Sequence, residues 1–232
     1  MEYEEVVTTR RSLHEYSDEE VTEETIEEIV RQATFAPSSF NLQPWEFLVV
    51  QDDDRLATLA EVANGQEHIE EASATVVVLG DLDPSRHAEP VFEDWLQKGY
   101  IPDEETKGYL VDTVDGMAEM PETERRVWTN RSTALAAQQF MTAAWNQGVA
   151  TLPMEGFDDE ALVKAFEIDD SEYEPVMLIA VGYPADGADE LAAERKYRRP
   201  VDEVVHYETF EPAGETSLDG DATGDASAPA DD

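Results

Sequence analysis

The sequence has no cysteine among its 232 residues, and it has no long apolar run. Without cysteine the protein cannot form disulfides, use a thiolate nucleophile or bind metals through sulfur. The apolar runs, such as Val176 to Val181, are too short to span a bilayer. The start, Met-Glu-Tyr-Glu-Glu, lacks the basic and apolar regions of a secretory signal, so we expect a cytoplasmic protein.

Several familiar catalytic motifs are also missing. The chain has no glycine-rich dinucleotide fingerprint, no Walker loop and no serine nucleophile flanked by glycines. Its four histidines do not have the spacing of metal ligands. A conventional hydrolase or metalloenzyme is therefore disfavoured, and we predict no metal site.

Positive charge is scarce. The chain has 15 basic residues, only four of them lysine, against 55 acidic residues, which gives a formal net charge of −40. Nucleic acids and anionic membranes are therefore poor partners. The hydrophobic content of 41% and the strand-like runs argue against disorder over residues 1–210. The composition resembles that of halophile cytoplasmic proteins, because molar salt shortens the screening length to roughly 3 Å and makes such repulsion tolerable.

The basic residues that remain are concentrated. Six of the fifteen lie in two short clusters, Arg10-Arg11 and Arg195-Lys196-Tyr197-Arg198-Arg199. A bound anion, such as the phosphate of a cofactor, is the simplest reason to concentrate cations in so acidic a chain. The alternative is a solvated surface cluster in which the cations pair with nearby glutamates.

Hydrophobic periodicity predicts strands that alternate with helices. The expected strands are 45–50, 74–79, 149–154 and 176–181, and the expected helices are 22–34, 55–63, 132–147 and 158–166. The polar stretch 84–128, with its aromatic islands, is too long for a simple connection and is expected to contain helices. The pattern indicates a three-layered α/β or α+β domain over residues 1–210, followed by an acidic, low-complexity and disordered tail over 211–232.

Four segments suggest chemistry by their order and separation. They are Arg10-Arg11-Ser12-Leu13-His14, Pro37-Ser38-Ser39-Phe40-Asn41-Leu42-Gln43-Pro44-Trp45, Pro153-Met154-Glu155-Gly156-Phe157 and Lys196-Tyr197-Arg198-Arg199-Pro200. Together they resemble the FMN-dependent nitroreductase family. The resemblance runs from about residue 3 to residue 207 and leaves out the variable 84–128 region and the tail.

The resemblance implies an α+β fold with a central, mostly antiparallel mixed sheet between helical layers, in an intertwined homodimer with its flavin sites at the subunit interface. It also implies FMN as cofactor and NAD(P)H as electron donor, in a ping-pong reaction of two-electron hydride transfer. Nitroaromatics and quinones are the typical acceptors of the family. Because the flavin carries the chemistry, no catalytic residue is required of the protein. The 84–128 region would form a lid over the pocket.

The basic clusters then acquire a role. By resemblance, Arg10 and Ser12, with Lys196 and Arg198, would hold the FMN phosphate and ribityl chain, since arginine offers a bidentate fork to phosphate. Arg11 would contribute through its backbone.

Three further segments have places in the implied site. Pro37, Ser38, Ser39 and Asn41 resemble the loop that reaches the flavin from the neighbouring subunit, although Pro-Ser-Ser alone is typical of an ordinary turn. Gln66 would bond the uracil edge of the ring, and a surface turn is the alternative.

The third strand supplies the last part. Pro153 and Met154, with Glu155 and Gly156, resemble the strip along the flavin face opposite the substrate, where the Glu155 and Gly156 backbone would donate to flavin N5 and O4. The alternative for this segment is a strand-to-helix turn.

One position departs from the family. His14 stands two residues beyond the serine, where a lysine or arginine is common and lies close to flavin N1 and O2. A histidine there would make the reduction potential depend on pH. The alternative is a partly exposed histidine that packs on the first helix.

Other functions stay open. The chain could be a non-catalytic flavin store or sensor, or a same-fold enzyme with a dedicated substrate, such as a dehalogenase, a flavin-fragmenting enzyme or an azoline oxidase. An interaction module without a cofactor is a third alternative.

Overall fold

The computed structural model describes residues 1–188 and 195–212. The chain divides into two compact units, Met1–Ala193 and Glu194–Asp232, and each is described by itself. The acidic tail expected over 211–232 lies, apart from its first two residues, outside the described part. Within that part, no helix combines the length and the apolar character needed to cross a membrane.

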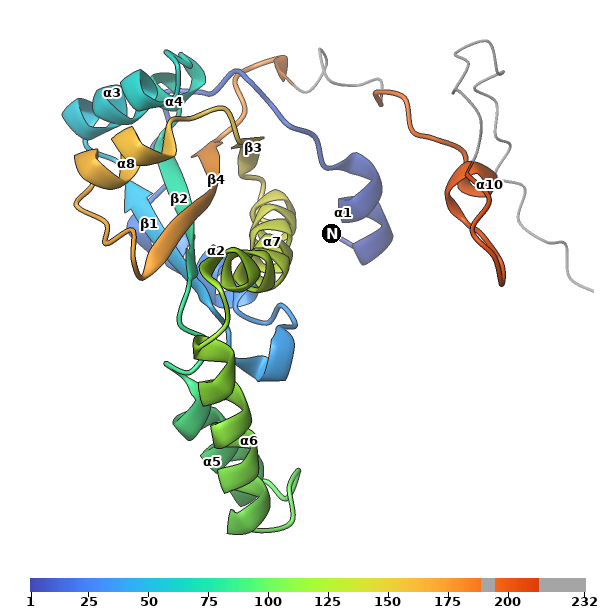
Figure 1. The fold of residues 1–232 in the computed structure, drawn as a ribbon. Helices are drawn as coiled ribbons and strands as arrows, with labels where there is room; N and C mark the ends of the chain where they lie inside the picture. Colours follow the sequence, from blue (N-terminus) through green and yellow to red (C-terminus); the bar gives the residue numbers. More distant parts are fainter. Residues whose placement is uncertain (189–194, 213–232) are drawn as a thin grey trace, which may run out of the picture. The chain divides into compact units, whose positions relative to one another are not determined.

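The first unit alternates helices and strands along the chain (Figure 1). The helices are α1 (Tyr3–Thr9), α2 (Glu23–Ala33), the 3-10 turn η1 (Ser39–Asn41), α3 (Asp53–Val62), α4 (His68–Glu71), α5 (Ala88–Gln97), α6 (Glu104–Ala118), α7 (Glu122–Asn146) and α8 (Asp159–Ala165). The strands are β1 (Trp45–Val50), β2 (Ala74–Asp81), β3 (Ala150–Met154) and β4 (Tyr173–Gly182). In the second unit, α10 (Val201–Val204) is a short helix.

The strands form one sheet in the order β1-β2-β4-β3, with every neighbouring pair antiparallel. All four strands were expected from the sequence, although β4 begins three residues before the predicted run. An isolated parallel bridge between Ser12 and Thr151 adds the N-terminal segment beside β3. The sheet agrees with the expected mostly antiparallel α+β architecture.

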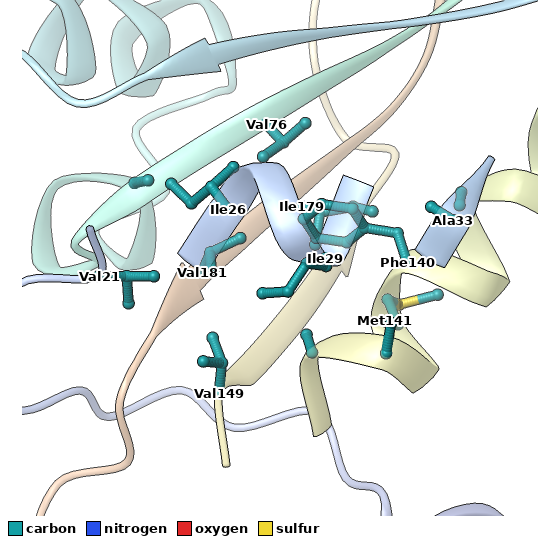
Figure 2. Packing of buried hydrophobic residues seen from close by; sticks show 14 of the residues in the cluster. Val21, Ile26, Ile29, Ala33, Val76, Phe140, Met141, Val149, Ile179 and Val181 are labelled. Carbon is teal, nitrogen blue, oxygen red and sulfur yellow. The ribbon is translucent and has the colours of Figure 1, made fainter. Parts of the chain in front are cut away.

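Alternation of side chains along the strands builds two cores, one on each face of the sheet. On one face, Val76 and Ile179 pack with Ile29 of α2 and Phe140 of α7 (Figure 2). On the opposite face, Val77 and its neighbours on the sheet pack against α3, α4 and α8. Helices therefore cover both faces of the sheet, which confirms the three-layered prediction.

Local capping explains where α2 begins. The Thr22 side chain accepts a hydrogen bond from the Thr25 backbone N–H at 3.2 Å, so Thr22 is the N-cap of this helix. The helix then buries Ile26 and Ile29.

The prediction for α7 was wrong at its N-terminal end. The helix starts at Glu122, ten residues before the predicted Ser132. Its first turns are held by polar contacts: Arg125 donates to the Leu82 carbonyl at 2.7 Å, and Arg126 pairs with the buried carboxylate of Glu174. These residues do not show the apolar periodicity of the later turns, so hydrophobic periodicity did not predict that the helix begins at Glu122.

The 84–128 region contains helices, as predicted. In Figure 1, α5 and α6 lie side by side beyond the end of the sheet. Lys107 of α6 joins Glu89 and Glu93 of α5 at 2.6 and 2.7 Å. Phe92 is fully buried between the helices and Leu42, so the aromatic islands partly serve to hold this helical pair together.

Candidate functional site

Two sequence-predicted site residues meet at the end of β3. The Gln66 side-chain amide donates to the Gly156 carbonyl at 3.0 Å, and the Asn64 amide donates to the same oxygen at 2.8 Å. Glu155 and Gly156 are exposed. Within residues 1–188 and 195–212, neither of their backbone N–H groups has an acceptor. The end of β3 therefore presents open N–H donors beside a fixed amide.

A tight turn after α3 aims these amides. Asn64 and Gly65 both have positive φ, 61° and 72°, and the Gly65 N–H donates to the Ala60 carbonyl at 2.8 Å. Positive φ is readily adopted by asparagine and glycine, which explains the Asn-Gly pair here. The turn brings Gln66 back toward β3.

The N-terminal segment runs along the outer side of β3. Ser12 forms the bridge to Thr151, Leu13 is buried, and the Tyr16 hydroxyl donates to the Leu13 carbonyl at 3.1 Å. The Tyr16 ring lies against Gly182, where a Cβ would come within 2.6 Å of the ring. Burial raises the pKa of Tyr16, and the nearby Glu71 carboxylate raises it further. This anchor holds the Arg10 to His14 segment next to the β3 site.

Sequence reasoning missed the residue that His14 contacts. His14 Nδ1 lies 3.2 Å from Nε2 of His68, and the two rings meet edge to face with centroids 4.7 Å apart. His68 follows Gln66 by two residues at the start of α4. Metal-ligand spacing gives no signal for two histidines 54 residues apart. Asn64, the other donor to the Gly156 carbonyl, was not among the predicted site residues.

The two arginines of the first cluster behave differently. Arg11 donates through Nη1 to the carbonyls of Thr8, Thr9 and Arg10 at 2.9–3.0 Å, so its guanidinium closes the end of α1. Arg10 is half-buried at the C-cap of that helix. The side chain of Arg11 is thus occupied by carbonyls, and its predicted backbone role stays a prediction.

The 37–44 loop lies at the other edge of the sheet. Ser38 Oγ accepts from the Gln43 N–H at 3.0 Å, and the Ser39 N–H donates to Ser132 Oγ at 3.4 Å. The loop leads into β1, whereas Gly156 follows β3, and three inter-strand steps of about 4.8 Å separate those strands by roughly 14 Å. Within a single chain, Pro37, Ser38, Ser39 and Asn41 are therefore not brought to the β3 site.

Lys196 and Arg198 belong to the second unit. Both are exposed, and Arg198 donates to the carbonyls of Lys196 and Tyr197 at 3.1 and 3.0 Å. Their predicted phosphate contacts stay predictions.

Residues 7–183 match the Nitroreductase family. The chain belongs to this family. The match covers the whole sheet, the Ser12 bridge, the Gln66 turn and the end of β3. It also includes the 84–128 region that the sequence resemblance left out.

Curated relatives of this nitroreductase-family chain come from several bacteria. It is 34% identical to the Bacillus subtilis protein MhqN, named as an NAD(P)H nitroreductase, over 89% of this chain and 98% of that protein. It is 30% identical to a Thermus thermophilus protein named NADH dehydrogenase, over 84% of this chain and 91% of that protein.

Solved structures share the family fold. A nitroreductase structure from Exiguobacterium sibiricum, in complex with FMN, is 29% identical and superposes with a TM-score of 0.79, covering 90% of this chain and 98% of that one. A nitroreductase structure from Bacillus subtilis gives a TM-score of 0.80 at 33% identity, covering 89% and 98%.

Proposed function

We propose that this nitroreductase-family protein is an FMN-dependent oxidoreductase that takes electrons from NAD(P)H and passes them to small acceptors such as nitroaromatics or quinones. The observation that carries the proposal is the end of β3, where exposed Glu155 and Gly156 N–H groups have no acceptor in the described part of the chain. Relatives named as NAD(P)H nitroreductase and NADH dehydrogenase, and a neighbour that holds FMN, support it.

The donor set fits a flavin ring. Exposed backbone N–H groups suit ring nitrogen and carbonyl atoms, and the Gln66 amide, fixed by Gly156, suits the polar edge of a uracil-like ring. Pro153 and Met154 would supply the apolar strip along one ring face. Arg10 and Ser12, with Lys196 and Arg198, would hold the phosphate and ribityl chain, and the Arg11 backbone would assist.

The position of the 37–44 loop favours a site shared between two subunits. The Ser39 N–H of the loop donates to Ser132 of α7, and the loop leads into β1, which lies roughly 14 Å from β3 across the sheet of its own chain. Pro37, Ser38, Ser39 and Asn41 could then complete the flavin site only in a partner subunit. We therefore include a homodimer in the proposal.

Bound FMN would supply two-electron hydride chemistry, in which NAD(P)H is the donor and the acceptor substrate binds after the oxidised nicotinamide has left. The protein binds and orients the ring through the donors of β3, and it places His14 at the polar edge. Its own side chains need not form a covalent bond with the substrate. The α5–α6 pair would cover the pocket.

The test is a visible absorbance spectrum of the protein purified in molar KCl, followed by anaerobic addition of NADH and then NADPH. We expect flavin bands that bleach within seconds and return when a quinone or a nitroaromatic is added. Flavin bands that persist with both nicotinamides would favour a flavin store or sensor. No flavin binding, even after FMN is added, would overturn the proposal.

Reoxidation by the acceptor distinguishes the proposed function from a same-fold enzyme with a dedicated substrate. If NADH or NADPH bleaches the flavin but neither nitroaromatics nor quinones restore the bands, the reductase half of the proposal stands and the acceptor class is wrong. A panel of halogenated aromatics and azolines would then follow.

A further inference from the structure

Three ionisable side chains form a chain in space at the edge of the β3 site. His14 Nδ1 lies 3.2 Å from His68 Nε2, and the other ring nitrogen of His68, Nδ1, lies 3.7 Å from a carboxylate oxygen of Glu71. His68 Nδ1 is buried and has no hydrogen-bond partner within the described residues. The order of these three side chains is therefore carboxylate, imidazole, imidazole.

This arrangement limits how many protons the two rings can hold. A hydrogen bond between ring nitrogens requires one N–H donor and one lone pair. The bond survives when the pair is neutral and when it carries one extra proton. A second extra proton would remove the lone pair and place two positive charges about 3 Å apart, which is strongly unfavourable. The pair is built to switch between zero and one positive charge.

The segments that carry the pair, and the elements next to them, hold more carboxylates than cations. The N-terminal segment carries Arg10, Arg11, Glu15 and Tyr16, the α4 segment carries Glu67, Glu70 and Glu71, α3 carries Asp53, Asp54, Arg55 and Glu61, and Glu155 follows β3. Carboxylates outnumber cations on these segments, and Glu71 directly faces His68.

The backbone places the pair beside the site. His14 lies two residues after the Ser12 bridge to β3, and His68 lies two residues after Gln66, which holds Gly156. The two segments meet at the histidines, so the pair links the two sides of the proposed flavin pocket.

We infer that His14 and His68 form a proton-holding pair, supported by Glu71, that binds one proton from solvent when the bound cofactor is reduced. The inference rests on the proposed function. Hydride transfer from NAD(P)H brings two electrons and one proton into the site and leaves an added negative charge, which the pair balances by taking up one further proton. The donor leaves as oxidised nicotinamide, and no covalent bond of the protein changes except the new N–H. His14 would face the ring, and His68 is a positioning residue that acts through it.

The first readout needs no cofactor. The imidazole nitrogens of the 15N-labelled full-length chain are followed by NMR from about pH 5 to pH 9 in molar KCl, across the range where histidines titrate. We expect His14 and His68, assigned through His14→Gln and His68→Gln, to titrate as a coupled pair, so that each substitution changes the titration of the other ring. His87→Gln is the matched control and leaves both unchanged. Independent titration of His14 in the wild type and in His68→Gln would overturn the pair.

The second readout is the midpoint potential of bound FMN against pH. Within the histidine range, the wild type is expected to take up one more proton per two electrons than His68→Gln. Glu71→Gln should weaken this extra uptake, and its neighbour Glu70→Gln should leave it intact. If the midpoint potential changes with pH by the same amount in the wild type and in His68→Gln, the inference is contradicted.

Failure of the proposed function and failure of the histidine pair give different results. A chain that refuses FMN overturns the proposed function and the cofactor half of the inference, while the NMR titration still decides whether the pair exists. A separation of 3.2 Å between imidazole nitrogens also suits two ligands of one zinc ion. If dialysis against EDTA abolishes the coupling in either readout, a metal bridges the rings and the inference is wrong.

Discussion

The two edges of the sheet differ in whether their backbone groups have hydrogen-bond partners. At the β1 edge, the Pro44 carbonyl accepts from the Asp81 N–H at 3.0 Å and from the hydroxyls of Thr129 and Thr133 at 3.2 and 3.0 Å. At the β3 edge, the Glu155 and Gly156 N–H groups are exposed and have no acceptor among the described residues. Saturated buried groups stabilise a fold, whereas open exposed donors are available to a ligand. Pro44 and its three donors, called the anchor below, therefore serve the stability of the fold, whereas the open donors at the end of β3 are available for binding.

The largest effect is expected from a methyl group added beside the anchor. In Gly80→Ala, the new Cβ would lie 2.9 Å from Thr129 Oγ1 and 3.0 Å from its Cγ2. Thr129 cannot move away without losing its bond to Pro44, so we expect a loss of about 1–3 kcal/mol in the free energy of unfolding, measured by denaturant titration in molar KCl.

Gly156→Ala is the matched control at the open edge. Among the described residues, its Cβ would meet only Gln66 Nε2, at an ordinary 3.6 Å, so stability should change by no more than about 0.5 kcal/mol. Equal destabilisation by the two alanines would show that the two edges are packed alike.

Removal of one hydroxyl donor from the anchor should lower the free energy of unfolding by less than Gly80→Ala does. Thr133→Val keeps the shape of the side chain but removes a buried donor to Pro44, so we expect a loss of about 1 kcal/mol in unfolding free energy. Thr142→Val is the control, because that hydroxyl bonds the Gln138 carbonyl within α7. If both substitutions cost the same, the anchor contributes no more than a helix-surface hydroxyl.

At the open edge, the effect should appear in binding instead of stability. Gln66→Ala removes the amide that fixes the Gly156 carbonyl, and the loss of one hydrogen bond of ~0.5–1.5 kcal/mol corresponds to FMN binding weakened roughly 2- to 12-fold. Fluorescence titration of FMN measures it. Gln97→Ala, which removes a surface amide on α5 that bonds Glu93, should bind FMN as the wild type does. An unchanged Kd in Gln66→Ala would remove Gln66 from the site.

The smallest effect concerns pH at the sheet end beside the anchor. Burial raises the pKa of Glu174, although Arg126 opposes the shift. The folded state therefore holds this proton more tightly than the unfolded state, so its contribution to stability is present below the ordinary glutamate value of about 4.3 and is lost as pH rises through the raised value. Glu174→Gln should remove this decline from a plot of unfolding free energy against pH.

Glu93 provides the opposite case. Its hydrogen bond with Lys107 lowers the pKa of Glu93, so its contribution is lost as pH falls. Glu93→Gln should therefore flatten the acid side of the profile and leave the decline above pH about 4.3, which comes from Glu174, unaltered. A Glu174→Gln profile parallel to that of the wild type would mean that Glu174 titrates normally in the folded protein.

Sequence patterns predicted the strands well and the start of α7 poorly. β1 was expected over 45–50 and is found there, because a short apolar run between a proline-rich loop and three aspartates has one simple interpretation. The first ten residues of α7 are largely polar, and their partners, the Leu82 carbonyl and the Glu174 carboxylate, come from distant parts of the chain. Contacts of this kind leave no period in the sequence.

The candidate site also has parts that the sequence predicted and parts that only the structure shows. Gln66 and Gly156 were both proposed from the sequence, yet their direct hydrogen bond depends on the turn after α3 and on the position of β3 in the sheet. His68 had no local signal, since its partner His14 is 54 residues away. The loop residues from Pro37 to Asn41 were correctly identified as a loop, while their distance from β3 follows only from the order of the strands.

By itself, the sequence determined the class of fold, the strands, the helices α2, α3 and α8, the later turns of α7 and the resemblance to nitroreductases, because these depend on local periodicity and on short motifs in a fixed order. The tertiary structure decided which residues face one another: the closed anchor at β1, the open donors at β3 and the meeting of His14 with His68. The physical reason is that hydrogen bonds and charge pairs act over about 3 Å in space, and residues that close can be separated by any length of chain.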